Sequence, residues 1–353
     1  MTTMKLPEFP DGFTPEFLSG VLDKNVVEVG EAPLGVGTGM MADISRLALT
    51  LSDGTKIPLI AKYATANLTN REVAISYNLY EREGRYYAEL DDLADIVTPE
   101  IYYSHFDGNF MLILMEDLKD YDVGSQVVGA TLEQTELALD ELAKLHSAFW
   151  DKVDHLDWVP GIADSYHAEN MMNLARSGWD NMVDLFGKFI PQEIRGYRDT
   201  FLEAIPKLQA TRYGEPRTLC HGDFRMENLL YAARQDHHPV VVLDWQGPLL
   251  SRGMFDVALF LGQSTKKEVR QVHERQLLER YLSGLEQGGV TGLDADQTWE
   301  DYRSTNLYDW VYTAVVAGNL DASDEVAFAW MSQMVDRQSV VSLDLNVFDL
   351  LPD

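Results

Sequence analysis

Residues 219–231 read Leu219-Cys220-His221-Gly222-Asp223-Phe224-Arg225-Met226-Glu227-Asn228-Leu229-Leu230-Tyr231. Two short apolar runs separated by polar residues and a glycine predict a strand, a loop and a second strand. A third apolar run, Val240–Trp245, follows and contains Asp244. Four residues separate Asp223 from Asn228, which is the Asp-to-Asn spacing of the kinase catalytic loop.

These residue types are the ones that transfer of a γ-phosphoryl group requires. A carboxylate beside the attacking hydroxyl orients it and accepts its proton, which is the role predicted for Asp223. Mg²⁺ prefers hard oxygen ligands, and Asn228 and Asp244 provide them. The alternative is a plain β-hairpin in which Asp and Asn form turns and His221 is a core residue. The two spacings together favour the phosphoryl-transfer interpretation.

The motifs in this region resemble the aminoglycoside phosphotransferase and choline kinase superfamily, which is the protein-kinase-like fold adapted to small molecules. The resemblance rests on His221-Gly222-Asp223-Phe224-Arg225-x-x-Asn228 and on Asp244-Trp245-Gln246. The Asp-Trp-Gln variant, with Arg252-Gly253-x-x-Asp256 after it, is most similar to the ecdysteroid-kinase-like (CHK kinase-like) branch. Leu142–Trp150 is similar to the helix that precedes the catalytic loop there, and the resemblance covers residues 30–290.

The resemblance implies roles for further residues of the loop. His221 and Asp256 match positions that brace the catalytic loop through hydrogen bonds. Arg225 stands where the family often has an aromatic residue or a histidine, so the contact it makes with substrate or phosphate stays open. Together with Asp223, His221 and Arg225 are the candidate catalytic residues.

The pattern along the chain fits such a fold. The first third predicts a hairpin, a helix from about Asn70 to Glu83, and a second hairpin. The hairpins join Leu47–Leu51 to Ile57–Tyr63 through Asp53-Gly54, and Ile101–Tyr103 to Phe110–Met115. From Thr131, which forms a possible capping box with Gln134, the pattern is mainly helical. Helices are predicted at about 131–150, 168–187, 192–210, 265–287 and 300–340.

We therefore predict an α+β, protein-kinase-like fold with two lobes. Residues 1–117 would form a small mixed β/α lobe that binds ATP. Residues 118–353 would form a larger, mainly helical lobe that carries the catalytic β-hairpin and binds the substrate.

Three elements of the first lobe are candidates for nucleotide binding. Gly35, Gly37 and Gly39 precede the first predicted hairpin, where backbone N–H groups can approach phosphates. Lys62, on the strand Ile57–Tyr63, is the candidate phosphate-binding lysine. Glu72, early in the following helix, is the predicted ion-pair partner of this lysine. Glu81 and Glu83 are weaker candidates for that partner.

The resemblance places a hinge after the second hairpin, where backbone groups would bind adenine. The candidates there are Met115, Glu116, Asp117 and Leu118. Glu116 and Asp117 are equally compatible with solvated linker charges.

Composition limits the partners of the chain. Its 353 residues include 28 basic and 57 acidic side chains, a formal charge of −29, which argues against nucleic acid or an anionic membrane as the main partner. The longest apolar runs are far too short to span a bilayer, and the N-terminus lacks a secretory pattern. A single cysteine, Cys220, excludes an intrachain disulfide. A cytoplasmic protein is expected, as a monomer or a homodimer.

The predicted function is an ATP- and Mg²⁺-dependent O-phosphotransferase that acts on a hydroxyl of a small molecule. Residues 289–353 carry twelve acidic and two basic side chains, which favours a cationic acceptor such as an amino sugar or a choline-like compound. The branch resemblance points instead to a bulky, sterol-like alcohol, and hydroxyacyl thioesters stay open. The alternative is a nucleotide-binding pseudokinase that acts as a regulator or scaffold. A protein kinase is disfavoured because no Asp-Phe-Gly or Ala-Pro-Glu segment is recognisable.

Overall fold

The structure, a computed structural model, describes residues 9–34 and 41–352, which form two compact units. The first unit contains the described residues of Met1–Leu93, together with Thr98–Asp120 and Leu243–Gly247. The second contains Ala94–Val97, Tyr121–Val242 and the described residues of Pro248–Asp353. Neither unit is one continuous stretch of chain. The segment with Asp244 belongs to the unit built from the N-terminal part of the sequence.

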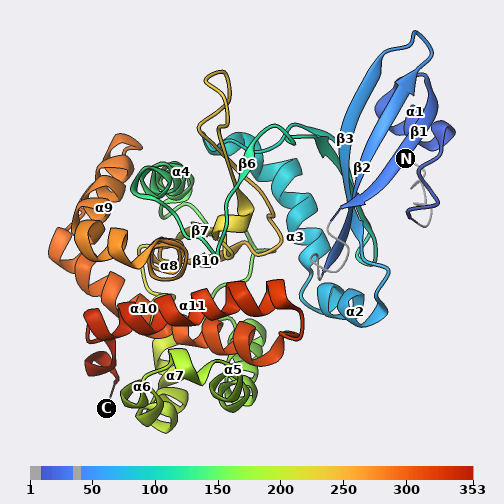
Figure 1. Cartoon of the computed structure of the whole chain (residues 1–353). Helices are drawn as coiled ribbons and strands as arrows, with labels where there is room; N and C mark the ends of the chain where they lie inside the picture. Colours follow the sequence, from blue (N-terminus) through green and yellow to red (C-terminus); the bar gives the residue numbers. More distant parts are fainter. Residues whose placement is uncertain (1–8, 35–40, 353) are drawn as a thin grey trace. The chain divides into compact units, whose positions relative to one another are not determined.

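The first unit is built on an antiparallel sheet with the strand order β1-β2-β3-β5-β4 (Figure 1). The strands are β1 (Val26–Leu34), β2 (Ala42–Leu51), β3 (Lys56–Ala64), β4 (Ile101–Phe106) and β5 (Met111–Glu116). Both predicted hairpins, β2–β3 and β4–β5, are confirmed. Gly54 closes the first with φ +85°, a conformation that favours glycine. Strand β1 was not predicted.

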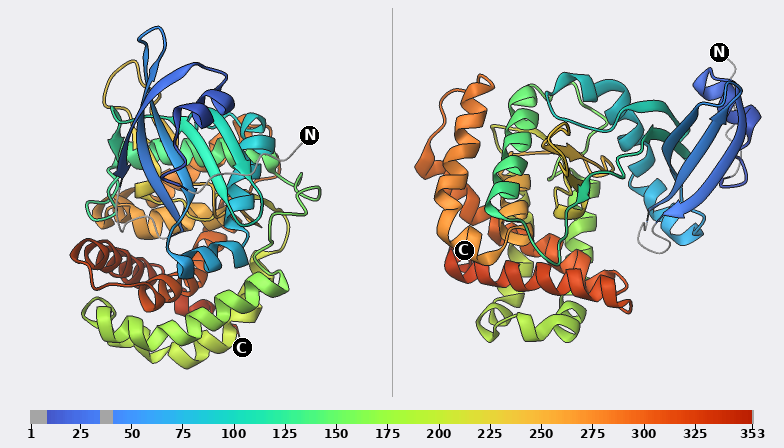
Figure 2. Two further views of the ribbon diagram at one scale, coloured as in Figure 1. Left: turned by 90° about the vertical axis from the view of Figure 1, so that its right-hand side faces the viewer. Right: turned by 45° about the horizontal axis from the view of Figure 1, so that its top comes forward.

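Alternation of side chains along the strands gives this sheet two apolar faces. Leu47, Leu59 and Leu112 are buried on one face, together with Leu18 from the N-terminal helix α1 (Pro15–Leu22) and Phe13, which precedes that helix. The other face buries a second cluster made of Ile113, Met115, Ala74 and Tyr80. Figure 2 shows the strands and their twist from two further directions. Both faces of the sheet are therefore covered, because successive side chains along a strand point to opposite faces.

The single helix predicted from Asn70 to Glu83 is wrong. Two helices are found instead, α2 (Leu68–Ser76) and α3 (Leu79–Arg85). They are separated by Asn78, which has φ +54° and ψ +30°, the left-handed conformation that asparagine tolerates better than most residues. This break turns the residues of α3 to a different side from the one that a continuous helix would give. A π-helical turn, η1 (Tyr86–Leu90), and a short 3₁₀ turn, η2 (Asp91–Leu93), continue the segment.

The second unit is mainly helical. Its first helix, α4 (Leu132–Phe149), begins at the predicted capping box, in which Thr131 Oγ1 accepts from Gln134 N–H and Gln134 Oε1 accepts from Thr131 N–H. The remaining helices are α5 (Ser165–Phe186), α6 (Gln192–Gly196), α7 (Arg198–Arg212), α8 (Met254–Leu259), α9 (Lys267–Gln287), α10 (Ala295–Asn319) and α11 (Glu325–Asp344), with short turns η3 (Gly187–Phe189), η4 (Met226–Asn228), η5 (Phe260–Ser264) and η6 (Val347–Leu350).

The predicted helix at 300–340 is two helices, because α10 ends at Asn319 and α11 begins at Glu325. Asp324 caps α11 by accepting from the N–H groups of Val326 and Ala327. Helix α10 packs tightly on α5, where a side chain at Gly318 would collide with the backbone of Gly178.

The β-island of this unit consists of two small sheets. β7 (Thr218–Cys220) pairs with β10 (Leu249–Ser251), while β8 (Leu229–Tyr231) lies between β6 (Asp122–Val123) and β9 (Val240–Val242). The predicted strands at 218–220 and 229–231 are confirmed, and the third ends at Val242. The loop between β7 and β8 therefore connects the two small sheets and is anchored at both ends.

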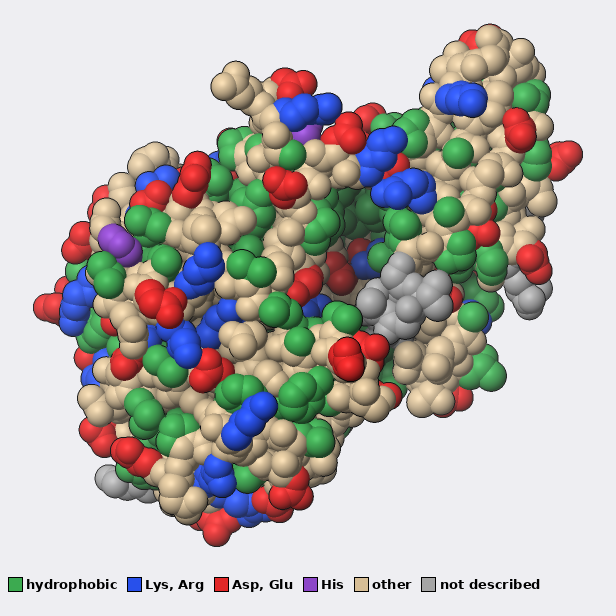
Figure 3. All heavy atoms as spheres, in the orientation of Figure 1, with side chains coloured by type: hydrophobic (Ala, Val, Ile, Leu, Met, Phe, Trp, Pro, Cys, Tyr) green, Lys and Arg blue, Asp and Glu red, His purple; other side chains and the backbone are tan. Residues whose placement is uncertain are grey.

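Acidic and basic side chains are interspersed over the face of the second unit that Figure 3 presents. The charge of −29 is therefore not gathered into one acidic patch on that face. In residues 9–34 and 41–352, none of the helices combines the length and the apolar character that crossing a membrane requires.

Candidate active site

Asp256 of α8 holds the loop that carries Asp223 through two backbone hydrogen bonds. Asp256 Oδ2 accepts from the N–H of His221 at 2.7 Å, and Asp256 Oδ1 accepts from the N–H of Gly222 at 3.0 Å. Gly222 has φ +85°, which allows the chain to turn sharply between the two bonds. His221 Nδ1 accepts from the N–H of Asp223 at 3.3 Å. The loop backbone is therefore held by hydrogen bonds to the N–H groups of His221, Gly222 and Asp223.

The Asp223 carboxylate is about half exposed and is oriented by two neighbours. Asn228 Nδ2 donates to the backbone oxygen of Asp223 at 2.8 Å and to Oδ2 at 3.1 Å. Arg225 Nε donates to the same Oδ2 at 3.2 Å. A carboxylate held at one oxygen and open to solvent is arranged to receive a proton at the other.

Arg225 is itself positioned by two further side chains of the second unit. Its guanidinium lies 5.2 Å from the ring centre of Trp330 on α11, and Nη1 lies 3.6 Å from Glu227 Oε2. Glu227 Oε1 in turn accepts from the N–H of Gln126 at 2.9 Å. The arginine predicted as a catalytic candidate is thus in contact with Asp223.

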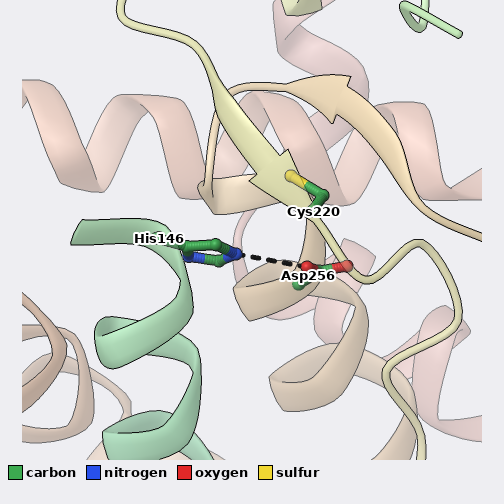
Figure 4. Close-up of side chains that lie close together, drawn as sticks. All are labelled: His146, Cys220 and Asp256. Carbon is green, nitrogen blue, oxygen red and sulfur yellow. Dashed lines mark hydrogen bonds and ion pairs between the residues drawn. The ribbon is translucent and has the colours of Figure 1, made fainter. Parts of the chain in front are cut away.

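His146, Cys220 and Asp256 form a buried polar cluster next to the start of the loop (Figure 4). His146 Nε2 lies 3.2 Å from Asp256 Oδ2, and His146 Nδ1 lies 2.8 Å from the hydroxyl of Tyr281. The ligand-type atoms of the three residues lie within 4.8 Å of one another, a separation that a metal ion would tolerate. Both nitrogens of His146 and both oxygens of Asp256 already have partners, so the cluster acts as a hydrogen-bonded brace.

The thiol of Cys220 is fully buried, and burial raises its pKa well above the usual value. We expect the native protein to resist alkylation by iodoacetamide, because the thiolate is the reactive species. The unfolded chain should react readily, so the labelling rate should follow unfolding. Because only the unfolded thiol ionises easily, its contribution to stability is present below pH 9 and is lost as the pH rises above it. Rapid labelling of the folded protein would contradict this expectation.

Lys62 of β3 is buried and forms ion pairs with two carboxylates of the first unit. Its Nζ lies 2.7 Å from Glu83 Oε1 and 2.9 Å from Asp244 Oδ1. Burial by itself lowers the pKa of this lysine, but Asp244 and Glu83 outweigh it and hold the pKa above the usual value. Lys62 is therefore a charged lysine fixed in an apolar surrounding.

The prediction that Glu72 pairs with Lys62 is wrong. Glu72 is exposed on α2, and the partner of the lysine is the fully buried Glu83 on α3. The left-handed Asn78 ends α2 and lets α3 start in a new direction, which brings Glu83 and not Glu72 to the lysine. Sequence context contained a signal: Glu83 lies among Tyr80, Gly84, Tyr86 and Tyr87, whereas the polar residues Asn70 and Arg71 precede Glu72.

Asp244 reaches Lys62 because a short segment of chain joins the first unit. Asp244 has φ +65°, which turns the backbone after β9. The next residue, Trp245, is fully buried and stacks on Tyr86 of η1 with ring centres 3.6 Å apart and planes within 4°. Stacking of two large aromatic rings fixes this segment beside Lys62.

The four predicted hinge residues lie at and just after the end of β5. Met115 and Glu116 pair in register with Ile60 and Leu59 of β3. The side chain of Asp117 is buried and accepts from Arg46 Nε at 2.9 Å and Nη2 at 3.2 Å, so it is not a solvated linker charge. The backbone binding of adenine predicted for Met115–Leu118 stays a prediction. Gly35, Gly37 and Gly39 lie outside the described residues.

The two predicted metal ligands have suitable chemistry. Asn228 uses its amide nitrogen to hold Asp223, and no donor lies on its Oδ1 in the parts of the chain that the structure describes. Asp244 is partly exposed and binds Lys62 through Oδ1. An amide oxygen and a carboxylate are the hard donors that Mg²⁺ takes. Each of the two residues, taken by itself, therefore offers an oxygen that suits Mg²⁺.

A comparison with models of protein families matches residues 36–289 to the ecdysteroid kinase-like family. The chain belongs to this family. The match spans both hairpins, the loop with Asp223, and the residues Asp244 and Asp256, so it covers the elements described above. Membership confirms the predicted family and supports a small-molecule phosphotransferase. No curated protein sequence matches the chain.

Solved structures confirm the protein-kinase-like α+β fold of this ecdysteroid kinase-like protein. A GDP complex of an aminoglycoside 2′-phosphotransferase of type IIIa is 13% identical, with a TM-score of 0.56, and the match covers 93% of this chain and 95% of that one. A GDP and kanamycin complex of the aminoglycoside phosphotransferase APH(2″)-IIIa is 14% identical, with a TM-score of 0.56 and coverage of 93% and 97%. A gentamicin complex of APH(2″)-IIa is 16% identical, with a TM-score of 0.50 and coverage of 95% and 99%.

Proposed function

We propose that this ecdysteroid kinase-like protein is an ATP- and Mg²⁺-dependent O-phosphotransferase that transfers the γ-phosphoryl group to a hydroxyl of a small molecule. The observation that carries the proposal is the catalytic loop: Asp223 is half exposed, oriented by Asn228 and Arg225, and fixed from behind by Asp256. Such an arrangement serves a reaction in which one carboxylate must accept a proton from a bound hydroxyl.

In the proposed reaction, the acceptor hydroxyl donates a hydrogen bond to Asp223. Its oxygen forms a bond with the γ-phosphorus, the bond from that phosphorus to the bridging oxygen breaks, and ADP leaves. The hydroxyl proton passes to Asp223. Because the transition state has little covalent help from the protein, the rate depends on how well Asp223 and the phosphates are positioned.

Lys62 has the place of the phosphate-binding lysine in this proposal. A charged lysine held by Glu83 is a fixed positive charge and costs no reorganisation when phosphates arrive. Asn228 and Asp244 would hold Mg²⁺, which neutralises charge on the phosphate oxygens. We also assign nucleotide binding to the glycine loop at Gly35, Gly37 and Gly39 and to the backbone of Met115–Leu118. These local groups would offset the acidity of the chain.

The acceptor belongs to one of four classes: a sterol-like alcohol, an amino sugar, a choline-like compound or a hydroxyacyl thioester. Aromatic residues of α10 offer little to distinguish them, because Tyr302, Tyr308 and Trp310 are fully buried in the helix packing. Acidic and basic side chains are mixed on the face in Figure 3, so the charge of this face does not favour a cationic acceptor over a neutral one.

A coupled assay of ADP release with one acceptor from each class tests the proposal. We expect Mg²⁺-dependent ADP release above the background hydrolysis for at least one class, and a phosphorylated product by mass spectrometry. Calorimetric titration with ATP and Mg²⁺ is the parallel measurement. Binding of ATP with no transfer and no hydrolysis would favour the regulator, and absence of nucleotide binding would overturn both proposals.

A further inference from the structure

A cavity of about 130 Å³ lies in the second unit, away from the Asp223 carboxylate. Its walls are largely apolar and include Trp150, Pro216, Met254, Leu282, Leu285 and Leu293. An engineered apolar cavity of about 150 Å³ in another protein binds benzene. The cavity therefore has room for a body of about the size of one aromatic ring.

One wall of the cavity carries an arginine whose charge is only partly compensated. Arg252 lines the cavity, and its Nε lies 3.0 Å from Asp301 Oδ2. The other oxygen of Asp301 accepts from Nη1 of the buried Arg212 at 2.6 Å. Two guanidinium groups thus share one carboxylate. No hydrogen-bond partner of the Arg252 Nη atoms is found within residues 9–34 and 41–352.

Other carboxylates do not supply the missing charge. Asp309 lies fully buried near Arg212, and burial raises its pKa well above the usual value, so it is a poor source of negative charge. Asp294 lies at the rim, is exposed to water and caps α10 by accepting from the N–H of Gln297 at 2.8 Å. Solvent screens its charge. A carboxylate entering the cavity would find a guanidinium fork that matches its geometry.

The cavity is connected to the catalytic loop by a chain of hydrogen bonds. Tyr281 lines the cavity and its hydroxyl lies 2.8 Å from His146 Nδ1. His146 Nε2 contacts Asp256, which holds the N–H groups of His221 and Gly222. Gly253 also lines the cavity, and a side chain there would collide with Tyr281 and His146. A ligand that fixes Tyr281 would therefore fix the brace behind Asp223.

We propose that this cavity binds a small organic carboxylate with an apolar body of about one ring, and that the bound ligand stiffens the catalytic loop through Tyr281, His146 and Asp256. The carboxylate would pair with Arg252, and the ring would contact Leu285 and Trp150. The regulatory consequence rests on the proposed function. The binding site itself does not.

Benzoate and benzyl alcohol are the probes, since they share the ring and differ in charge, and benzoate has no hydroxyl to be phosphorylated. We expect calorimetry to give saturable binding of benzoate and an affinity about tenfold to hundredfold lower for benzyl alcohol, as a charged hydrogen bond contributes. Arg252→Gln should lower the affinity for benzoate by a similar factor. The matched control is Arg280→Gln, which should leave this affinity unchanged: Arg280 is on the same helix as Tyr281 and pairs outside the cavity with Asp140.

Leu282→Trp, which fills the cavity, should abolish benzoate binding even if Arg252→Gln proves unstable. Hydrogen exchange at His221 and Gly222 should slow when benzoate is bound to the wild-type chain. Equal affinity of benzoate and benzyl alcohol, benzoate binding unchanged in both cavity variants, or unchanged exchange in the loop would each overturn the inference. Phosphotransfer without benzoate binding would overturn the binding site and leave the proposed function intact. Benzoate binding without phosphotransfer would leave the binding site intact and count against the proposed function.

Discussion

Replacing Asp223 with Asn is expected to lower turnover by about 10² to 10⁴-fold, the usual contribution of a positioned general base. The amide keeps the shape of the carboxylate and a hydrogen bond with Asn228 but cannot take the hydroxyl proton. Stability should change little because the side chain is about half exposed. Calorimetric affinity for ATP and Mg²⁺ should stay near that of the wild type, since the substitution removes no proposed phosphate contact.

The matched control is Asp199→Asn, a largely exposed aspartate on α7 that forms an ion pair with Arg198. It should leave ADP release unchanged. If the Asp223→Asn variant keeps the turnover of the wild type with an identified acceptor, Asp223 is not the base. A loss of turnover that is accompanied by loss of folding, as followed by thermal unfolding, would point to the loop architecture instead.

Removing Lys62 should have a large effect on stability as well as on activity. Lys62→Met leaves Glu83 buried without a counter-charge, and loss of one member of a buried ion pair costs about 3–5 kcal/mol. Urea unfolding should therefore show a strongly reduced free energy of unfolding. The double variant Lys62→Met/Glu83→Gln should recover part of the lost free energy of unfolding, because neither position then carries a charge. Activity should stay lost.

Glu72→Gln is the control that separates the two glutamates. We expect Glu83→Gln to reduce ATP affinity and turnover, and Glu72→Gln to change neither, because Glu72 is exposed. The opposite ranking would show that the ion pair with Glu83 has no role in nucleotide binding.

The pH dependence of the Lys62→Met variant follows from the same pair. Burial raises the pKa of the Glu83 carboxyl, and the lysine that opposes this effect is gone in the variant. The folded variant then binds a proton more readily than the unfolded chain does. Its deficit in stability should grow as the pH rises above the ordinary glutamate pKa of 4.5 and shrink as the pH falls toward it.

Local patterns predicted most of the fold correctly. Turn residues and alternating apolar residues located both hairpins of the sheet, and the capping box located the start of α4. The Asp-to-Asn spacing placed Asp223 and Asn228 in one loop, where they are in contact. These features depend on residues close together in the sequence, so local sequence patterns predict them.

The features that were missed depend on backbone turns and on distant parts of the chain. One asparagine in a left-handed conformation divides α2 from α3 and changes which glutamate meets Lys62. The pairing of Arg46 with Asp117 joins β2 to the residue that follows β5, and the whole α2–α3 segment lies between the two in the sequence. The periodicity of apolar residues predicts neither the helix break nor this ion pair, because both depend on packing in three dimensions.

The segment Leu243–Gly247 has a consequence for the order in which the chain is built. When a ribosome has completed Asp120, the sheet and its helices are all present, yet Tyr86 lacks its stacking partner Trp245 and Lys62 lacks Asp244. The N-terminal unit acquires these contacts only after helices α4 to α7 of the second unit have been synthesised. A nascent chain of that length is a sheet with an exposed aromatic ring and a half-neutralised lysine. Completion of the first unit thus waits for translation of several helices of the second.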